Sequence, residues 1–492
     1  MAEPHDELTT RRARLVALRA AGKDPFPSTV ERTHELIALR EQFETLLTET
    51  ATVSVVGRVR SIREHGGSTF MTIDDGTATM QLYCKKDDLG DDQYAALQTI
   101  DVADFVSARG TCFLTKRLEP SVLCNAAPII ITKALRPLPE KWHGLSDVEI
   151  RYRKRYLDLL VNEPAKKTAL TRAALLRELR NFLDENSYIE VETPILQDIP
   201  GGATARPFMT HFNALDLDMY LRVAPELFLK RLLVGGIPKV YEIARCFRNE
   251  GIDHSHNPEF TQVEMYEAFA DYEAYMRFVE KMLSTLLLRL TGGMTVVGPT
   301  GETIDFTPPY ARKDWMTTLN EAAKIDVGAL DDVALKAFME ERNIDCEVTD
   351  GRGTLLDKTY KVLVRPNILQ PTFLIHHPVS LSPLAKRLKG NSELTERFQL
   401  VLGGGIELVN GFSELNDPDD QRERFEGQEK LRDSGDEEAH RIDENFITAL
   451  EHGMPPAAGL GMGIDRLAAL ITGNTTLKEV ILFPTLRPEA EN

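Results

Sequence analysis

The sequence predicts an α+β protein in which a small N-terminal β-barrel precedes a larger domain with a mixed, mainly antiparallel sheet and helices. From Val53 the apolar residues alternate with a period of two in short runs separated by Gly, Asp and Pro, a pattern typical of small barrels. Beyond residue 166, strands and helices alternate without regular βαβ spacing, which favours the α+β class. The 492 residues suit two or three domains of roughly 150 residues each.

The first third of the chain divides into an extension, a barrel and a linker. Residues 1–48 predict a helical extension that is broken at "GKDPFPS" by Gly and Pro. Residues 49–135 hold four or five short strands, including "VSVVGRVRSI" and "STFMTIDDGTATMQLY", and this number suits an OB-fold. The proline-interrupted "KALRPLPEKWHGL" indicates a linker, which we place at 136–165.

Residues 166–492 form the predicted larger domain. It begins with a helix from about Thr168 to Asn186, and a strand in "YIEVETPIL" follows, stopped by Pro194. The weakest signals fall in 325–365, which we interpret as a possible inserted subdomain.

Composition limits the possible partners. The chain has 58 Lys and Arg against 76 Asp and Glu, a net charge of −18, so its surface as a whole repels polyanions. Nucleic acid would have to bind at local basic patches, for which "RYRKRYLDLL" is a candidate, and a solvated helix face is the alternative. None of the five cysteines form a C-x-x-C pair, so neither a zinc knuckle nor a disulfide framework is supported.

Targeting and membrane signals are also missing from the sequence. The N-terminus has no apolar signal-peptide core, and no run reaches the roughly 18 apolar residues needed to cross a bilayer. We therefore expect a cytoplasmic protein with no membrane partner.

The stretch "RCFRNEGIDHSHNPEFTQVEMYEAF" predicts two strands joined by a polar loop much longer than a usual hairpin connection. Long loops on rigid strands often carry function. Arg248 can bind a phosphate with both arms of its guanidinium, Glu250 can accept a hydrogen bond from an amine, and Phe260 can stack on a flat base. An ordinary exposed hairpin with a surface ion pair is the alternative.

Two further stretches carry candidate ligand-binding residues. "GGGIELVNGFSELNDP" places Glu407 and Glu414 seven residues apart, with Asn410 and Phe412 between them, and two such carboxylates can hold Mg²⁺ beside substrate phosphates. In "GLGMGIDRLAALI", alternating glycines allow a close backbone approach, and Arg466 can clamp a phosphate. The alternatives are two surface glutamates and a glycine-weakened strand packed on a neighbour.

In their order along the chain, these stretches resemble the signature motifs of class II aminoacyl-tRNA synthetases. "YIEVETPIL" with Pro194 is similar to motif 1, the polar hairpin to motif 2 and "GLGMGIDRL" to motif 3. The stretches "TKALRPLPEKWHGL", "IPGGATARPFMTHFNALDLDMYLRVAPELFLKRL", "NGFSELNDPDDQRERF" and "MPPAAGLGMGIDRL" resemble the lysyl-tRNA synthetases. The resemblance implies an OB-fold anticodon-binding domain at 49–135 and a class II catalytic domain at 166–492.

The resemblance implies activation of L-lysine with ATP and transfer of the lysyl group to tRNA(Lys), with ATP as substrate and Mg²⁺ as cofactor. Arg248 would be catalytic at the α-phosphate and the lysine carboxylate, and Arg466 would be catalytic at the γ-phosphate. Glu407 and Glu414 would carry Mg²⁺ to the phosphates. The other residues implied to bind ATP are Glu250, His256, Asn257 and Phe260, with Phe260 stacked on adenine.

Selection of lysine requires buried anions and acceptors for an ammonium group with three donors. Glu226, Glu264 and Tyr266 are the matching positions, whereas an aspartate or asparagine enzyme should offer cationic or amide groups there. The other residues implied to form the lysine pocket are Gly202, Asn410, Phe412 and Glu414, with Gly202 letting the backbone approach the substrate amino group.

In the barrel, Phe70 could stack on an unpaired base or could belong to the barrel core. Arg63 and Gln81 match positions that the resemblance assigns to reading the lysine anticodon. Glu119 is a fourth candidate, although "RLEPS" departs from the family's Gly-Glu-Leu at this turn.

The resemblance also implies a homodimer, with Pro194 and the preceding helix at the interface. A lysylating paralogue that modifies a protein is one alternative, and the barrel at residues 53–132 argues against it. A catalytically retired synthetase that serves as a tRNA-binding or regulatory protein is another. The joint presence of Arg248, Glu407, Glu414 and Arg466 argues against the latter.

Overall fold

The computed structural model describes residues 4–139, 145–203, 205–251, 253, 256–347, 350–433 and 441–489. The chain divides into two compact units, the first ending at Ser146 and the second beginning at Asp147.

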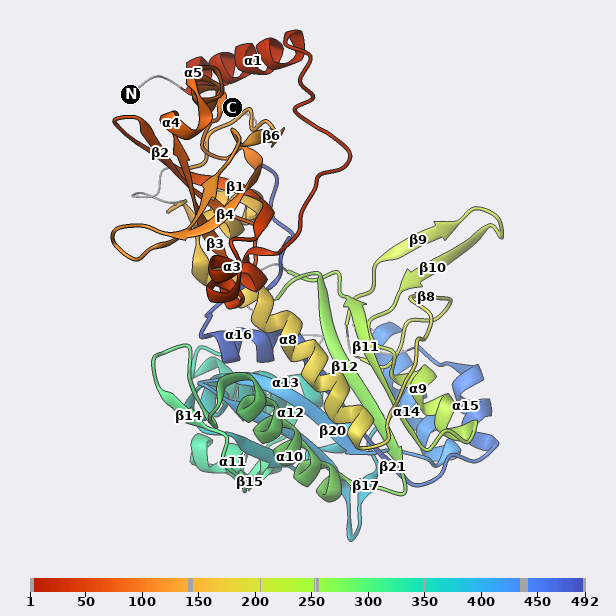
Figure 1. Ribbon diagram of the computed structural model, residues 1–492. Coiled ribbons are helices and arrows are strands. Elements are labelled where there is room, and N and C mark those ends of the chain that lie inside the picture. The colour runs from red at the N-terminus through yellow and green to blue at the C-terminus, as the bar shows by residue number, and fades with distance from the viewer. Residues whose placement is uncertain are drawn as a thin grey trace. The chain divides into compact units, whose positions relative to one another are not determined.

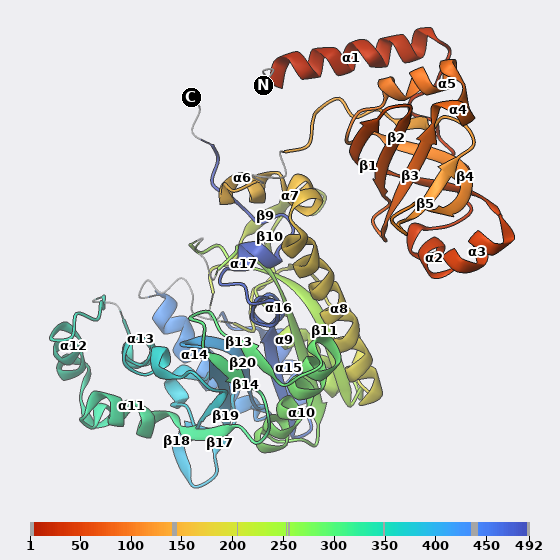
Figure 2. The same ribbon diagram turned by 60° about the vertical axis from the view of Figure 1, so that its left-hand side comes forward.

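The first unit is a closed barrel with helices packed on it (Figure 2). β1 pairs antiparallel with both β2 and β4, so the order β1-β2-β3-β5-β4 returns to β1, and β6 adds to β4. β3 and β5 pair in parallel. The elements are α1 Pro4–Ala20, α2 Leu36–Glu41, α3 Phe43–Glu49, β1 Thr52–His65, β2 Ser68–Asp74, β3 Thr79–Lys85, α4 Lys86–Leu89, α5 Asp91–Ala96, η1 Leu97–Thr99, β4 Phe105–Leu114, β5 Pro120–Cys124 and β6 Ile129–Thr132.

Side-chain alternation decides what enters the barrel core. On β2, Met71 and Ile73 are fully buried, whereas Phe70 lies on the opposite face and is half-buried. Helix residues such as Leu39 and Phe43 join the same core cluster, so the N-terminal segment packs on the barrel. The OB-fold expected from the period-two pattern is therefore confirmed.

The second unit is built on an eight-stranded sheet in the order β15-β16-β19-β20-β21-β12-β11-β7. Its pairs are antiparallel except β15–β16 and β7–β11, which confirms the mixed, mainly antiparallel sheet. Its first elements are α6 Val148–Arg153, α7 Arg155–Val161, α8 Glu163–Glu185, β7 Ile189–Glu190, β8 Leu196–Gln197, β9 Met209–Phe212, β10 Leu217–Leu221, α9 Glu226–Val234, β11 Lys239–Phe247, β12 Glu259–Ala268, α10 Tyr272–Thr291, β13 Thr295–Val297, β14 Thr303–Asp305 and β15 Ala311–Asp314.

The later elements complete the sheet and its helical layers. They are α11 Trp315–Ala323, η2 Val327–Ala329, α12 Asp332–Glu340, α13 Arg352–Leu363, η3 Arg365–Asn367, β16 Thr372–Ile375, η4 Val379–Leu381, β17 Arg387–Leu388, β18 Asn391–Thr395, β19 Arg397–Leu402, β20 Ile406–Ser413, α14 Pro418–Asp433, α15 Glu444–Glu451, β21 Ala457–Gly463, α16 Ile464–Thr472 and α17 Leu477–Val480.

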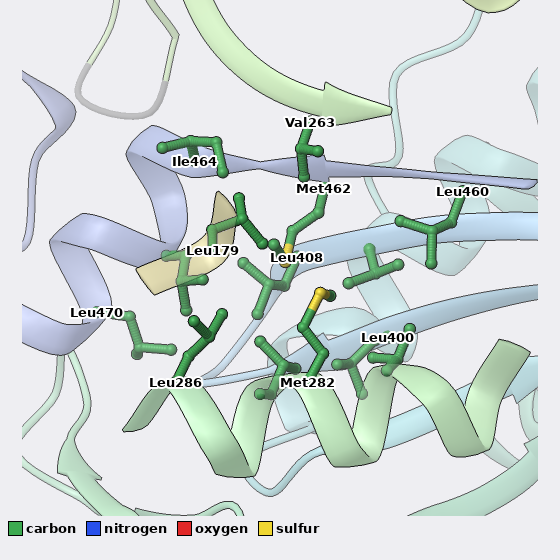
Figure 3. Packing of buried hydrophobic residues seen from close by; sticks show 14 of the residues in the cluster. Leu179, Val263, Met282, Leu286, Leu400, Leu408, Leu460, Met462, Ile464 and Leu470 are labelled. Atoms are coloured by element: carbon green, nitrogen blue, oxygen red, sulfur yellow. The ribbon is translucent and has the colours of Figure 1, made fainter. Parts of the chain in front are cut away.

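The two faces of this sheet are covered by different helices (Figure 1). Helices α8, α10 and α16 pack on one face, where Val263, Met282 and Leu460 belong to one buried cluster (Figure 3). Helices α9, α14 and α15 cover part of the other face through a second cluster that includes Tyr266 and Phe446. Adjacent residues on β12 therefore point to opposite faces of the sheet and into different hydrophobic clusters.

The structure differs from the expected linker at 136–165. Within that range α6 and α7 form and belong to the second unit. Arg155 is buried. Its guanidinium tolerates burial because it donates to Asp158 Oδ2 at 2.7 Å and to the carbonyl oxygen of Leu482 at 3.0 Å. A charged segment can leave solvent when each charge is paired and hydrogen-bonded, and the sequence pattern alone does not reveal such partners.

Two other regions refine the expectations. The strand expected in "YIEVETPIL" is reduced to β7 and β8, because Pro194 has no N–H to continue a ladder. The range 325–365 forms α12 and α13, which pack with α11 around Trp315 in a hydrophobic cluster that also includes Leu374 of β16 and Val401 of β19. Among the residues described, no helix is long and apolar enough to span a membrane.

Candidate active site

The long polar loop joins β11 to β12 and is held at its base by backbone contacts. The Arg248 N–H donates to the carbonyl oxygen of Pro258 at 2.8 Å. Further along, the His256 backbone N–H donates to Asp253 Oδ1 at 2.8 Å, and the ring Nδ1 lies 2.9 Å from Oδ2 of the same residue. The Asn257 side chain donates to the Glu259 carbonyl oxygen at 2.6 Å. The described part of the loop is therefore folded on itself beside β12.

Strands β20, β21 and β12 lie next to one another and form the floor of a cavity of about 220 Å³. Glu264 and Tyr266 occupy alternate positions of β12 and share its cavity face. Their Cα partners on β21 are Gly461 and Gly459. A Cβ atom at Gly459 would overlap the Tyr266 ring and the Glu414 carboxylate. The alternating glycines of motif 3 therefore leave space for the large polar side chains of motif 2.

The structure brings the predicted ATP- and lysine-binding residues together in this cavity, with Glu414 as the exception. Glu414 follows β20 and lies buried behind Gly459. The predicted residues that line the cavity are Gly202, Glu226, Arg248, Glu250, His256, Asn257, Phe260, Glu264, Tyr266, Glu407, Asn410, Phe412 and Arg466.

One end of the cavity is a buried acidic cluster. Lys230 Nζ lies 2.7 Å from Glu226 Oε1 and 2.5 Å from Glu414 Oε2. Glu264 Oε2 accepts from the Tyr266 hydroxyl at 3.1 Å. Glu414 Oε1 is buried and accepts no hydrogen bond from any residue that the structure describes. A buried acceptor without a donor is costly, so a ligand that donates hydrogen bonds would be stabilised here.

The charges of this cluster do not balance. Three carboxylates, at Glu226, Glu264 and Glu414, face the ammonium of Lys230 and the more distant guanidinium of Arg397. Burial raises the pKa of each carboxyl, and it raises the pKa of Glu414 to about 8 against the opposing effect of Lys230. The raised pKa values therefore keep protons on the empty cluster, and a ligand cation would take the place of these protons.

The other end of the cavity is cationic. The Arg248 guanidinium lies 5.0 Å from the centroid of the Phe260 ring, and its buried Nε donates to no described residue. Arg466, in the first turn of α16, donates from Nη1 to the carbonyl oxygen of Glu407 at 2.8 Å, which leaves its other donors for a ligand. Two guanidiniums beside an aromatic ring suit a phosphate chain attached to a flat base.

A metal ion shared by Glu407 and Glu414 does not fit this structure. Glu414 lies seven positions after Glu407 along the strand direction, which separates them by about 23 Å at about 3.3 Å per residue, and Glu414 is paired with Lys230. Glu407 Oε1 accepts from Gln399 Nε2 at 3.2 Å and lines the cavity. Within the described ranges, no three His, Cys, Asp or Glu side chains gather as a metal cluster. Glu407 alone fits a Mg²⁺ ion that takes its other ligands from phosphates and water.

Several residues of the site were not predicted from the sequence. Lys230 neutralises the acidic cluster, and Arg397 donates from Nε to Asn410 Oδ1 at 2.9 Å and so orients that amide. Gln262 donates to Glu264 Oε1 at 2.6 Å. For Lys230 a signal existed, because a lysine four residues after a glutamate in the apolar helix "ELFLKRLLV" indicates an internal ion pair.

The four predicted anticodon residues lie close together on the side of the barrel that faces away from its core, where Gln81 is buried beneath its neighbours. Phe70 stacks on Tyr83 with ring centroids 4.5 Å apart, outside the barrel core. Arg63 is the Cα partner of Phe70 across β1 and β2. Gln81 Oε1 accepts from the Ser121 hydroxyl at 3.0 Å, and that hydroxyl also lies 3.2 Å from the backbone oxygen of Glu119 in the β4–β5 turn. The possibility that Phe70 is a barrel-core residue is therefore excluded.

Comparison with protein families agrees with this architecture. Residues 147–487 match the model of class II tRNA synthetases for D, K and N, and residues 53–130 match that of the OB-fold nucleic acid binding domain. The fold and the site thus define the chain as a class II aminoacyl-tRNA synthetase, an enzyme that uses ATP as a substrate.

Relatives over the full length define the family further. A lysine–tRNA ligase of Moorella thermoacetica is 46% identical over 489 residues, covering 99% of each chain. Those of Pelotomaculum thermopropionicum and Syntrophomonas wolfei are 47% and 46% identical, covering 98% of this chain and 95% and 97% of their own lengths. The chain belongs to the lysine–tRNA ligase family, and nothing in these comparisons favours the catalytically retired paralogue.

Proposed function

We propose that the cavity binds ATP and L-lysine together, forms lysyl-adenylate, and then transfers the lysyl group to tRNA(Lys). The observation that carries this proposal is the opposite charge of the two cavity ends. The acidic end around Glu226 and Glu264 holds protons that a ligand cation would replace, and the other end presents the guanidiniums of Arg248 and Arg466. Lysine and ATP supply the matching charges.

In the proposed arrangement, the lysine ammonium enters the acidic end of the cavity and donates to Glu226, Glu264 and the Tyr266 oxygen, which line it. Its carboxylate then points towards Arg248, which neutralises it together with the α-phosphate. Positioning and charge neutralisation suffice for attack of a carboxylate on phosphorus, and no protein nucleophile is needed. Gly202, whose φ of 87° is left-handed, brings the backbone against Glu226 at the amino-acid end.

For the nucleotide, Phe260 stacks on adenine and Arg466 holds the terminal phosphate. Glu250, His256 and Asn257 line the nucleotide end of the cavity. Glu407 holds the Mg²⁺ that the family uses with ATP, and the ion supplies charge neutralisation at the phosphates. We infer that the enzyme works in the cytoplasm, where its tRNA substrate is charged.

The proposal is tested by exchange of pyrophosphate into ATP, run with each of the twenty amino acids in turn. We expect exchange with lysine and with no other amino acid, and we expect it to require Mg²⁺. Exchange with aspartate or asparagine would keep the fold and overturn the assignment of the acidic cluster. No exchange with any amino acid would overturn the proposed activation step.

Lysine binding should release protons and strengthen as the pH rises towards about 8, where the raised pKa of Glu414 lies. Protons are released because the empty cluster holds them on its carboxyls, and these carboxyls must ionise to neutralise the lysine ammonium. The ammonium itself stays charged, since its pKa is about 10.4. Titration calorimetry in two buffers of different ionisation enthalpy measures the protons released. A binding enthalpy that does not depend on the buffer would contradict the prediction.

Replacing Phe70 with Ala should lower kcat/KM for tRNA roughly 5- to 100-fold, because base stacking on an aromatic ring contributes about 1–3 kcal/mol. Lysine-dependent pyrophosphate exchange should not change, since the ring lies in the first unit. Aminoacylation and exchange assays on the same preparation measure both. Phe26→Ala, which removes an exposed aromatic ring elsewhere in that unit, is the control. Equal loss of both activities would exclude an anticodon role.

We further propose that the protein is a homodimer. The region around motif 1 exposes apolar side chains, and the hairpin β9–β10 extends away from the sheet (Figure 1). Exposed apolar surface of this kind is typical of protein interfaces. Sedimentation should give twice the chain mass for the protein and the single mass for Leu215→Asp. The exposed apolar residues of this region are Ile189, Ile195, Leu196, Met209, Phe212, Leu215 and Leu217.

A further inference from the structure

A second cavity, of about 550 Å³, adjoins the ATP cavity in the same unit. The two cavities share Glu407, Arg466 and Leu477 in their linings. A group held by Arg466 in the first cavity therefore stands at the entrance of the second.

The charged lining of this second cavity is mainly cationic. Lys361, Arg365 and Arg466 face a single lining carboxylate, Glu407, in a chain whose net charge is −18. Lys361 Nζ is paired with Asp357 at 2.7 Å. The Arg365 guanidinium forms no hydrogen bond or ion pair with any residue of the described ranges, although its residue is half-buried. An arginine left without a counter-charge in a cavity is available to an anionic ligand.

The glycine loop before β20 shapes the wall beside Arg365. Gly403, Gly404 and Gly405 all have left-handed φ values, of 57°, 72° and 122°. A Cβ atom built on Gly405 would lie 3.5 Å from Arg365 Nε and 3.6 Å from its Cγ. The arginine therefore lies along a wall without side chains, where an anion can reach the guanidinium.

Like charges are crowded at the junction of the two cavities. Burial lowers the pKa of Arg466, Glu407 opposes this effect, and the positive charges of Arg248 and Arg365 add to it. A ligand with two or more negative charges would reduce this repulsion, and phosphate groups are the anions that arginine binds with two parallel hydrogen bonds.

We propose that the second cavity is an additional anion site that takes a diphosphate group, with Arg365 as its principal ligand. This inference rests on the proposed function. In that reaction a lysine carboxylate oxygen forms a bond to the α-phosphorus, and the bond from that phosphorus to the oxygen bridging to the β-phosphate breaks. The bonding electron pair leaves on the diphosphate, which moves from Arg466 towards Arg365.

The diphosphate could be the outer part of bound ATP or the free product, and two measurements distinguish these sources. Arg365→Glu and Arg365→Lys are compared with wild type in lysine-dependent pyrophosphate exchange, which gives KM for ATP and for pyrophosphate separately. Calorimetric titration with inorganic pyrophosphate measures binding directly. Arg277→Glu makes the same charge change on α10, away from both cavities. Thermal melting verifies that the variants are folded.

We expect Arg365→Glu to weaken pyrophosphate binding roughly 10- to 100-fold, as loss of a charge-assisted contact implies, and we expect Arg365→Lys to retain part of it. An unchanged KM for ATP would assign the site to the free product, and a parallel rise would assign it to the outer phosphates of ATP. Unchanged pyrophosphate binding in Arg365→Glu would overturn the inference. Absence of exchange in wild type would instead contradict the proposed function, and the calorimetric titration would still test the cavity.

Discussion

Replacing Glu264 with Gln is expected to raise KM for lysine roughly 10- to 100-fold while KM for ATP stays unchanged. The substitution keeps the size of the side chain and one oxygen that can accept from Gln262, but its amide nitrogen cannot accept from the Tyr266 hydroxyl as Glu264 Oε2 does. It also removes one of the three carboxyls of the acidic cluster, which can become negative when the lysine ammonium binds. A hydrogen bond to a charged group contributes about 1.5–3 kcal/mol, and each 1.4 kcal/mol changes affinity about tenfold. Lysine-dependent exchange at varied lysine and ATP concentrations measures both constants.

The matched control is Glu267→Gln on the same strand. Glu267 points to the other face of β12, where it contacts Lys239 at 2.7 Å and accepts from the Tyr188 hydroxyl. It should change stability without changing KM for lysine. A lysine KM that does not respond to Glu264→Gln would show that the ammonium is held elsewhere, since Glu264 is central to the proposed pocket.

Much of the fold follows from short-range patterns in the sequence. The alternation around Phe70 and Met71 predicts the barrel, because a strand in a closed sheet must bury every second side chain. The break at "GKDPFPS" falls between α1 and α2. The helices α6 and α7 could not be predicted as part of the second unit, because burial of Arg155 depends on carbonyl groups more than 300 residues away.

The site was predictable where its residues share neighbouring strands, and this explains both a success and a failure. Glu264, Gly461 and Asn410 come from three separate stretches of the sequence and lie side by side, because β12, β21 and β20 pair in register. The same strand geometry holds Glu407 and Glu414 too far apart to share a metal ion. A spacing of seven residues alone does not distinguish an extended strand from a compact turn, so the sequence did not reveal this separation. Arg397 gave no signal, because its role depends on the long-range contact with Asn410.

Replacing Arg248 with Lys is expected to lower the rate of lysyl-adenylate formation about 10²- to 10³-fold, the loss typical of removing one preorganised donor at a developing charge. Lysine carries a single ammonium on a flexible stem, so it cannot bridge a carboxylate and a phosphate as the planar guanidinium does. The contact of Arg248 with the Phe260 ring, at 5.0 Å from the centroid, also fixes the plane of the guanidinium. Rapid-quench measurement of a single turnover reports this step directly.

Arg245→Lys provides the comparison, because Arg245 is exposed on β11, three residues before Arg248, and is not part of the cavity lining. Its adenylate rate should equal that of wild type. If Arg248→Lys lowered the rate only through a higher KM for lysine, the guanidinium would serve substrate binding alone. A fall in the single-turnover rate at saturating lysine and ATP would instead locate its effect in the transition state, because only interactions stronger there than in the ground state change that rate.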